Sequence, residues 1–365
     1  MTIMTDQPLE VIAGVDTHGQ THHAAVIDHL GRHLADQEFT ATGTGYRQLM
    51  AWLGSHGSVA AVGVEGTGAY GAELARVLAQ AGFTVTEVDR PDRKMRRLKG
   101  KSDSIDAYAA ATAVASGRAT GLPKTRDGIV EAIRVLRVPR RSAVKARTQA
   151  INQTRQLLVT APEALRAQLR GLSAAQLAST CARLRPEDLT GPMGATKAAL
   201  RSLGRRILAL DEEIADLDAE LRTLTSQAAP ALITRMGVGP DVAGQLLATA
   251  GDNPDRLRSE AAFAHLCGVA PIPASSGRRD RHRLNRGGDR AANHALHTIA
   301  LSRMRWDPRT RTYVQRRTEQ GLSKKEILRC LKRHIAREIY RVLIDDLHIR
   351  RGVAPGSPIN LAKAA

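Results

Sequence analysis

The stretch Val11-Ile12-Ala13-Gly14-Val15-Asp16 decides the fold of the first third of the chain. Five small or apolar residues that end at a carboxylate are typical of a buried strand with a polar side chain at its carboxyl end. Comparable patterns predict strands at 21–28, 34–40, 59–64 and 83–88, and helices at 46–53 and 70–81. Three strands followed by helix, strand, helix and strand indicate a mixed α/β sheet.

That order of elements is the order of a ribonuclease-H-like domain. The chain then continues with helical patterns, which start near Ser102 and run to about Ser116, and start again over 128–160. Pro139 lies inside the second pattern, and proline removes a helix hydrogen bond, so we expect a kink or a break there. Past Pro230 the sequence changes to helices with glycine-rich turns, which indicates a further domain.

The clearest periodicity lies between 200 and 224, where apolar residues recur in alternating steps of three and four. The members of this seam are Leu200, Leu203, Ile207, Leu210, Ile214, Leu217, Leu221 and Leu224. Such a spacing is a heptad repeat. It predicts either one helix of a hairpin packed on the 128–160 helix or a contact between two copies of the chain, and the sequence favours neither.

The composition indicates a partner with many negative charges. The 365 residues include 54 Lys and Arg against 36 Asp and Glu, a formal net charge of +18. Nucleic acid is the first candidate for so basic a chain, and a membrane surface is disfavoured because no basic helix with an aromatic face is present. The three cysteines form no CxxC pair, no signal segment opens the chain, and no apolar run could span a bilayer, so we expect a soluble protein of the reducing cytoplasm.

Four carboxylates are placed where they could meet. Asp16 and Glu65 each follow an apolar strand, and Asp103 and Asp106 lie three residues apart at the start of a helix, so they point to one side. Such a set could hold two divalent cations, and Mg²⁺ suits ligation by oxygen alone. A single aspartate of this kind more often serves a helix end through the dipole, but the ordered set favours a metal site.

Histidines near Asp16 do not add a transition-metal site. His22 and His23 lie on opposite faces of their strand by alternation. We expect these two and His18 to lie on the surface or to contact the metal ligands.

A basic run precedes Asp103 and could hold a polyanion over the carboxylates. Its members are Arg93, Lys94, Arg96, Arg97, Lys99 and Lys101.

A second constellation lies near the C-terminus, where the proline-rich segment 268–277 ends in Ser275, Ser276 and Gly277. A serine on such a loop can be exposed, and neighbouring arginines could pair with a phosphate and stabilise charge during attack by the serine oxygen. The arginines that follow are Arg278, Arg279, Arg281, Arg283 and Arg286. A nucleophilic serine and a loop that only contacts DNA fit these residues equally well. The turn at 236–243 resembles a helix-hairpin-helix phosphate site, although an ordinary helix connection has the same pattern.

Taken together, these motifs resemble those of the DEDD transposases of insertion-sequence family 110 (110/1111), the bridge-RNA-guided recombinases. The matching segments are GVDT at 14–17, VEGTG at 64–68, KSDSIDA at 101–107, and the loop from Gly268 to Gly277 with NRGGD at 285–289. They occur in the family's order and span nearly the whole chain.

The resemblance implies a RuvC-like domain over 1–126, a helical coiled-coil region over 127–229, a mostly α C-terminal transposase domain over 230–351 and a disordered tail over 352–365. It implies that Asp16, Glu65, Asp103 and Asp106 are catalytic metal ligands and that the nucleophile is the serine before glycine, Ser276, with Ser275 as the alternative.

The family's behaviour further implies donor and target DNA as substrates, a structured bridge RNA as guide, and a serine–DNA phosphodiester intermediate. It also implies a homo-oligomer, dimer to tetramer, in which one protomer's carboxylates face another's serine. The location that the resemblance implies is the bacterial cytoplasm, in association with the nucleoid.

Three alternatives stay open at this point. A RuvC-like junction nuclease would use the carboxylates without the serine. A non-catalytic nucleic-acid-binding protein would need only the basic surface. A site-specific DNA invertase would use the same chemistry on a chromosomal site.

Overall fold

A computed structural model describes residues 9–89, 100, 102–277 and 281–352 of the chain. The chain forms two compact units. The first contains the described residues up to Asp127 together with Gly251–Arg256, and the second contains Gly128–Ala250 and the described residues from Leu257 onward. The two units are described separately below.

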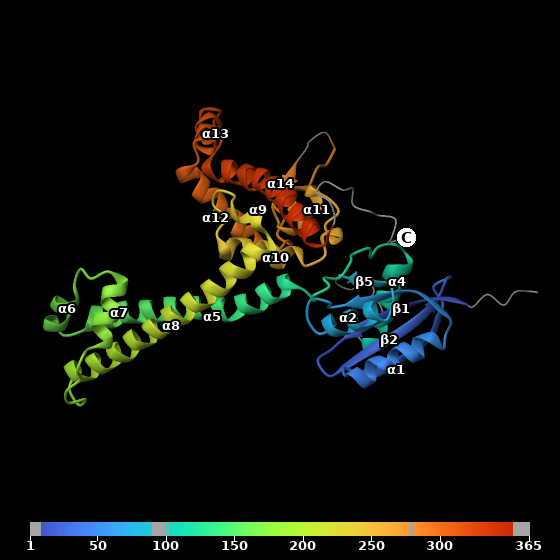
Figure 1. The fold of residues 1–365 in the computed structure, drawn as a ribbon, viewed down its shortest axis with the longest axis horizontal. Helices are drawn as coiled ribbons and strands as arrows, with labels where there is room; N and C mark the ends of the chain where they lie inside the picture. The colour runs from blue at the N-terminus through green and yellow to red at the C-terminus, as the bar shows by residue number, and fades with distance from the viewer. Residues whose placement is uncertain (1–8, 90–99, 101, 278–280, 353–365) are drawn as a thin grey trace, which may run out of the picture. The chain divides into compact units, whose positions relative to one another are not determined.

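The first unit is built on a five-stranded mixed sheet (Figure 1). Its strands are β1 (Glu10–Thr17), β2 (Thr21–Asp28), β3 (His33–Thr40), β4 (Ser58–Glu65) and β5 (Val85–Val88), in the spatial order β3-β2-β1-β4-β5. β1 pairs antiparallel with β2 and parallel with β4, and β4 pairs parallel with β5. The mixed α/β sheet expected from the sequence is therefore present.

The two faces of this sheet are covered differently. Helices α1 (Gly43–Gly54) and α2 (Ala72–Gln80) bury their apolar residues, such as Leu49 and Leu74, with Val15 and Val64 on one face. Helix α4 (Asp103–Ala115) packs on β1 and β4 on the other face. Because side chains alternate along a strand, Gly14 and Asp16 lie on the α4 face while Val15 lies on the α1 face.

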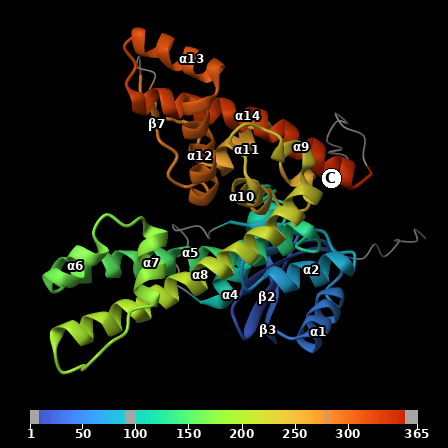
Figure 2. The same cartoon turned by 60° about the vertical axis from the view of Figure 1, so that its left-hand side comes forward.

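The second unit begins with a long antiparallel helix pair (Figure 2). Helix α5 (Ile129–Thr160) leads to the short helices α6 (Glu163–Leu169) and α7 (Ala174–Ala182), and α8 (Pro192–Ala228) returns along it. Ion pairs tie the two long helices together, from Arg140 to Asp218 at 2.5 Å and from Arg147 to Asp211 at 2.7 Å.

The apolar seam on α8 packs inside the chain. Leu200, Ile207, Ile214 and Leu221 are buried, and other members of the seam, such as Leu203 and Leu224, pack beside them. The hairpin interpretation is thus the arrangement present within this chain.

Helix α5 is continuous through Pro139, so the predicted break does not occur. The helix is anchored on both sides of the proline. Arg137 donates to the Oδ1 atom of Asp241 at 2.8 Å, and Arg140 pairs with Asp218. These contacts hold the turn that lacks the proline's N–H in register with its neighbours.

The remainder of the second unit is mostly helical. It comprises α9 (Pro230–Ile233), α10 (Pro240–Ala250), α11 (Glu260–Leu266), α12 (Arg290–Trp306), α13 (Pro308–Glu319) and α14 (Lys324–Arg350), with the short strands β6 (Ile272–Pro273) and β7 (His282–Arg283). The helices share one core that includes Leu246, Phe263, Leu296 and Ile339. None of the helices in the described part of the chain is long and apolar enough to cross a membrane.

Candidate metal centre and serine hairpin

The carboxylates Asp16 and Glu65 stand at the ends of neighbouring parallel strands. Each follows the same three-residue pattern, Gly14-Val15-Asp16 on β1 and Gly63-Val64-Glu65 on β4. Gly14 pairs with Gly63 in the register of the two strands, and the fully buried valines pair with each other. The acids at the end of each pattern therefore fall side by side on the α4 face, because alternate residues share a face.

The two glycines allow α4 to lie directly on the sheet. A Cβ atom added to Gly14 would stand 2.2 Å from both the carbonyl oxygen of Ala107 and the amide nitrogen of Ala111. At Gly63 an added Cβ would stand 2.7 Å from the side chain of Val114. Only glycine leaves room for this approach, which brings Asp103 and Asp106 from the first turn of α4 to the carboxyl ends of β1 and β4.

Helix α4 is fixed at its start and along its outer side. The Ser102 hydroxyl caps the helix by accepting from the Ile105 amide at 3.3 Å. Farther along, the Tyr108 hydroxyl donates to Asp36 at 3.2 Å, and Asp36 also contacts His23 at 2.7 Å. Burial, with the Asp36 charge, raises the pKa of Tyr108 to about 12, so the phenol keeps its proton. These contacts hold the acids of α4 in a fixed position.

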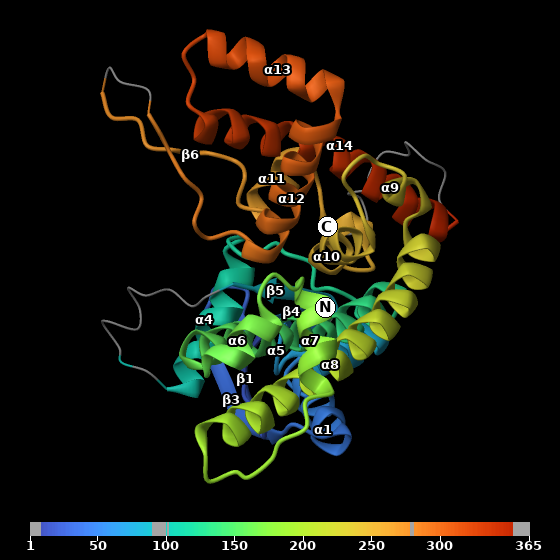
Figure 3. The ribbon, with the colours of Figure 1, turned by 90° about the vertical axis from the view of Figure 1, so that its left-hand side faces the viewer.

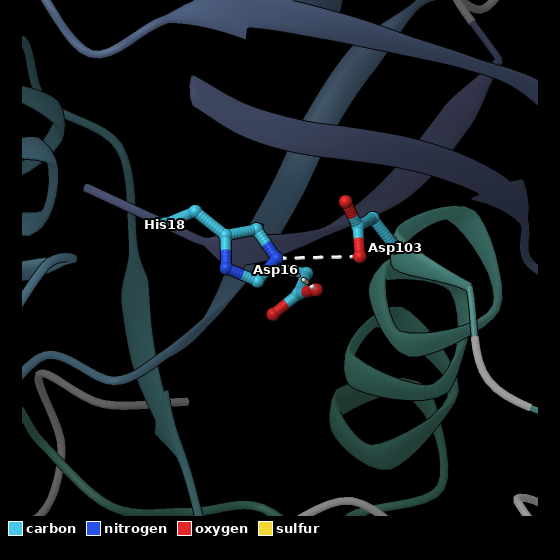
Figure 4. Close-up of side chains that lie close together, drawn as sticks. All are labelled: Asp16, His18 and Asp103. Atoms are coloured by element: carbon cyan, nitrogen blue, oxygen red, sulfur yellow. Dashed lines mark ion pairs between the residues drawn. The ribbon is translucent and has the colours of Figure 1, made fainter. Parts of the chain in front are cut away.

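His18 lies between two of the predicted metal ligands (Figure 4). Its Nε2 atom is 3.2 Å from Asp16 and 3.3 Å from Asp103. These three side chains offer ligand atoms within 4.8 Å of one another, as close as the ligands of one metal ion. Burial raises the pKa of Asp16, His18 opposes this shift, and Asp106 and Asp103 add to it. Asp16 therefore lies within electrostatic range of both acids of α4.

Glu65 and Asp106 meet in a neighbouring cavity of about 480 Å³. Glu87 and Asp89 from the end of β5 line the same cavity. Glu87 is held in place because it accepts from the Thr67 hydroxyl at 2.5 Å and pairs with Arg256 at 3.0 Å. The structure thus brings the four predicted acids to one corner of the sheet.

The sequence interpretation left two places open for His18 and did not include Glu87. His18 contacts two of the acids directly, which was one of those two places, and Glu87 joins the same cavity as Glu65 and Asp106. His22 and His23 face opposite sides, as alternation requires, but the expectation that His22 lies on the surface is wrong. His22 is fully buried against Tyr46, with ring centroids 5.7 Å apart. The sequence did contain one signal for the position of α4. A glycine stands two residues before the acid in both strands, and two such glycines on one face of a sheet leave room for a helix.

The serine segment forms a hairpin rather than an irregular loop (Figure 3). β6 and β7 pair antiparallel, and Ala274 donates its amide to the Arg281 carbonyl at 2.8 Å. The Ser275 hydroxyl accepts from the Arg281 amide at 3.1 Å. Ser276 is exposed, and among the described residues its hydroxyl has no hydrogen-bond partner. The two serines therefore differ: the Ser275 hydroxyl contacts Arg281 across the hairpin, whereas the Ser276 hydroxyl is exposed.

The root of this hairpin is fixed by the segment that begins at Asn285. Gly268 and Gly288 touch so closely that a Cβ on Gly288 would stand 2.3 Å from the Gly268 amide nitrogen. Asn285 donates to the His265 carbonyl at 3.0 Å. Asp289 caps α12 by accepting from the Ala291 and Ala292 amides. The glycines, Asn285 and Asp289 thus have structural roles that position the serines.

The structure places only some of the predicted basic residues. Arg281 and Arg283 are exposed on the strand that leaves the hairpin, and Arg286 follows at its root. Two residues of the predicted set, Arg278 and Arg279, lie outside the described residues, and so do Arg93, Lys94, Arg96, Arg97, Lys99 and Lys101. Of the predicted tail 352–365, all but Gly352 also lies outside them. The turn predicted to bind phosphate leads into α10, and Gly237 adopts a φ of +83° where it packs against α12.

Two family comparisons bear on what this geometry serves. A transposase family of the DEDD, IS110 type matches residues 13–161. The IS116/IS110/IS902 transposase family matches residues 229–315. The first match covers the four acids and the second covers the serine hairpin, and together they span more than half of the chain. The chain belongs to the IS110 family of transposases.

Two relatives resemble this transposase over nearly its whole length. It is 26% identical to the 42 kDa protein of insertion element IS900 from Mycobacterium paratuberculosis, covering 92% of this chain and 96% of the relative. It is 25% identical to the IS117 mini-circle protein of Streptomyces coelicolor, named as a candidate transposase, covering 87% of this chain and 90% of the relative. An IS110-family transposase is an enzyme of DNA transposition, and its substrate is DNA.

Proposed function

We propose that this transposase cuts and rejoins DNA with two groups of residues, a carboxylate metal centre at the end of the sheet and a nucleophilic serine on the hairpin. The observation that carries the proposal is the convergence of Asp16, Asp103 and His18, with Glu65 and Asp106 beside them. Strands in the order β3-β2-β1-β4-β5 with α4 across them support a RuvC-like fold for this unit.

The residues fit a divalent cation. Asp16 is 6% exposed, and burying an acid beside two others is costly unless a cation neutralises them. Carboxylate oxygens are hard ligands, which favour Mg²⁺. Asp16, Glu65, Asp103 and Asp106 would hold the metal, and His18 would yield its place between Asp16 and Asp103. Bound there, the ion would supply Lewis-acid polarisation of a phosphodiester.

The serine step conserves the phosphodiester. The Oγ atom of Ser276 forms a bond to phosphorus while one P–O bond to the adjacent deoxyribose breaks. The serine proton leaves to solvent or a nearby base, and the released sugar oxygen takes up a proton. Because no water is consumed, the reverse attack by another strand's hydroxyl rejoins DNA. Arg281 and Arg283 are exposed near the serine on the hairpin and would pair with the phosphate oxygens.

The family resemblance extends the proposal to partners. The net charge of +18 suits a protein that neutralises many phosphates, and the scarcity of aromatic residues favours contacts to the backbone over stacking. A bridge RNA that pairs with donor and target DNA, and an assembly of two to four protomers, complete the proposed function.

Recombination between donor and target plasmids tests the proposal in cells that also contain the element's flanking noncoding DNA. We expect product junctions from the wild type and none from Ser276→Ala or Asp103→Asn. Asp103 is a suitable target because its side chain is 44% exposed, so the variant should fold. Equal product from Ser276→Ala would overturn the serine mechanism and favour a junction nuclease that uses the acids alone.

A second assay distinguishes the roles of Ser275 and Ser276. Ser276→Ala is expected to abolish the covalent protein–DNA adduct, seen as a slowly migrating band on a denaturing gel. Ser275→Ala removes a hydrogen bond to Arg281, worth about 1 kcal/mol in typical cases, and should reduce the adduct at most severalfold. Loss of the adduct only in Ser275→Ala would identify Ser275 as the nucleophile.

Mixing two inactive variants tests whether one protomer's acids serve another's serine. If they do, an oligomer of Asp103→Asn and Ser276→Ala protomers contains one site with intact acids and an intact serine. We expect the mixture to recover part of the wild-type adduct. If acids and serine of one protomer worked together, each site in the mixture would carry a defect and the adduct would stay absent.

A further inference from the structure

Two cavities adjoin at the root of the serine hairpin, between the hairpin and α14. Their volumes are about 350 and 570 Å³, and both are lined by Gly268, Leu284, Asn285, Arg329 and Lys332. The smaller cavity has apolar walls, such as Val269 and Pro271. A volume of this order is that of a small-molecule site and is large enough for a nucleotide.

Cations, and no acidic side chain of the described residues, line the walls of these two cavities. Arg329, Lys332 and Arg333 come from α14, and Arg286 and Arg290 flank the hairpin. None of the described residues that line either cavity is acidic. Glu326, one turn before Arg329, already accepts from the amide and hydroxyl of Ser323. Glu326 and Glu260 lie within electrostatic range of Arg329 and Arg333, but neither acid lines a cavity, so the walls themselves carry an excess of positive charge.

The half-buried cations are costly to keep there. The Lys332 ammonium donates to the neutral Oδ1 atom of Asn293 at 2.8 Å, so its charge gains no anionic partner from this contact. Burial and the charge of Arg329 lower the pKa of Lys332. The Nη1 atom of Arg333 is buried and, among the described residues, has no hydrogen-bond partner. Half-buried cations that outnumber the acids around them are expected where a ligand supplies the anion.

We propose that these cavities form a phosphodiester-binding site, in which Arg329 and Lys332 hold backbone phosphates of the nucleic-acid strand that runs past the serine hairpin. The apolar wall would contact the sugar or an unstacked base of that strand. The inference rests on the proposed function, since it assigns a path to the substrate of that site. It adds α14 to the binding surface, whereas the sequence motifs pointed to the hairpin, the basic run and the turn at 236–243.

The site is tested by nucleic-acid binding on the full chain, without chemistry. Fluorescence anisotropy of a labelled DNA duplex is measured in a salt series with EDTA present, in a Ser276→Ala background, so the outcome does not depend on the serine or the metal. The test pair is Arg329→Gln with Lys332→Gln. The matched control is Arg311→Gln with Lys325→Gln, which removes the same charge from exposed positions on α13 and α14 outside the cavities.

We expect the test pair to weaken binding at least about tenfold more than the control. The slope of log K against log salt should fall by about 0.9 for each phosphate that the variant no longer neutralises. The series is repeated with an RNA hairpin as probe. A selective weakening with either probe supports the site and identifies which strand occupies it, and equal weakening by the test and control pairs for both probes would overturn it.

A second variant guards against misfolding of the double mutant. Leu284 is 53% exposed and lines both cavities, so Leu284→Glu adds an anion while every cation remains. We expect it to weaken binding, whereas Leu301→Glu, at a residue 46% exposed on α12, should not. Unchanged binding by Leu284→Glu, with circular dichroism like that of the wild type, would also contradict the proposal.

Discussion

A buried histidine makes the first unit sensitive to acid. His22 is fully buried beside Tyr46, and neither of its ring nitrogens has a hydrogen-bond partner among the described residues. Burial lowers the pKa of His22 below its value of about 6.5 in the unfolded chain. Below about pH 6.5 the unfolded chain therefore binds a proton at His22 that the folded protein does not bind. The free energy of unfolding has its full value above about pH 6.5 and decreases as the pH falls below it.

We expect His22→Phe to remove part of this pH dependence. The wild type should lose up to about 1.4 kcal/mol per pH unit more than the variant below about pH 6.5. Urea unfolding monitored by circular dichroism at several pH values measures the difference. Parallel pH profiles for the two proteins would show that His22 is protonated to the same extent in both states.

Individual residues of the site were predictable to different degrees. The four acids could be identified because each stands at a strand end or helix start that the sequence indicates. The position of Glu87 could not be predicted, because it is fixed by contacts with Thr67 and Arg256, which are 20 and 169 residues away in the sequence. His18 was visible beside Asp16, but its contact with Asp103 requires the packing of α4 on β1.

Among the elements, the close packing of α4 on the sheet depends on the absence of a side chain at Gly14. We expect Gly14→Ala to destabilise the protein by at least the roughly 1–3 kcal/mol typical of overpacked cores, because the new Cβ would meet backbone atoms of α4 at 2.2 Å. The displacement of α4 would also separate Asp103 and Asp106 from Asp16.

The midpoint of urea unfolding measures this cost, with Gly54→Ala as the control. Gly54 ends α1, and nothing lies within 4 Å of a Cβ added there, so its substitution should change stability little. A Gly14→Ala protein as stable as the control would mean that α4 can shift without penalty.

The seam on α8 gives a second test at this scale. Ile214 is 7% exposed within the hairpin, so Ile214→Ala should cost about 2–5 kcal/mol whatever the protein concentration. Leu208, 39% exposed on the same helix, is the control, and Leu208→Ala should cost less than about 1 kcal/mol. A destabilisation that grows as the protein is diluted would instead indicate that the seam joins two copies.

Element types followed from the sequence because hydrophobic period and strand ends are local signals. The predicted strand at 21–28 coincides with β2, and the helix predicted from Ser102 begins at Asp103. Of the two outcomes expected at Pro139, a break does not occur, because tertiary contacts on both sides of the proline maintain α5. The pairing of β6 with β7 was missed since two-residue strands carry no period.

At the scale of the whole molecule, the first unit is completed by residues far along the chain. Arg256 contacts Glu87 and the Leu122 carbonyl, and Asn253 donates to the Pro123 carbonyl at 2.9 Å. We expect Arg256→Met to destabilise the first unit by about 1–3 kcal/mol, because a half-buried carboxylate loses its charged partner.

Hydrogen exchange resolved by peptide measures this effect, since it reports β5 separately from the helical unit. Protection should fall around Val85–Val88 and stay constant in α12. Arg311→Met, at an exposed position on α13 in the second unit, is the control. Equal protection of β5 in both variants would show that the segment adds nothing to the sheet.

The contribution of Gly251–Arg256 to the first unit also sets an order of events on the ribosome. Domains usually fold as they emerge, N-terminal part first. Here the strands of the sheet leave the exit tunnel long before Arg256 is translated. The contacts of Arg256 with Glu87 and Leu122 can therefore form only after the whole helix pair has been synthesised. A messenger RNA truncated after the codons of the sheet but before the codon of Arg256 would yield a protein that carries all four acids but lacks the ion pair between Arg256 and Glu87. Such fragments should be preferred targets of cellular proteases.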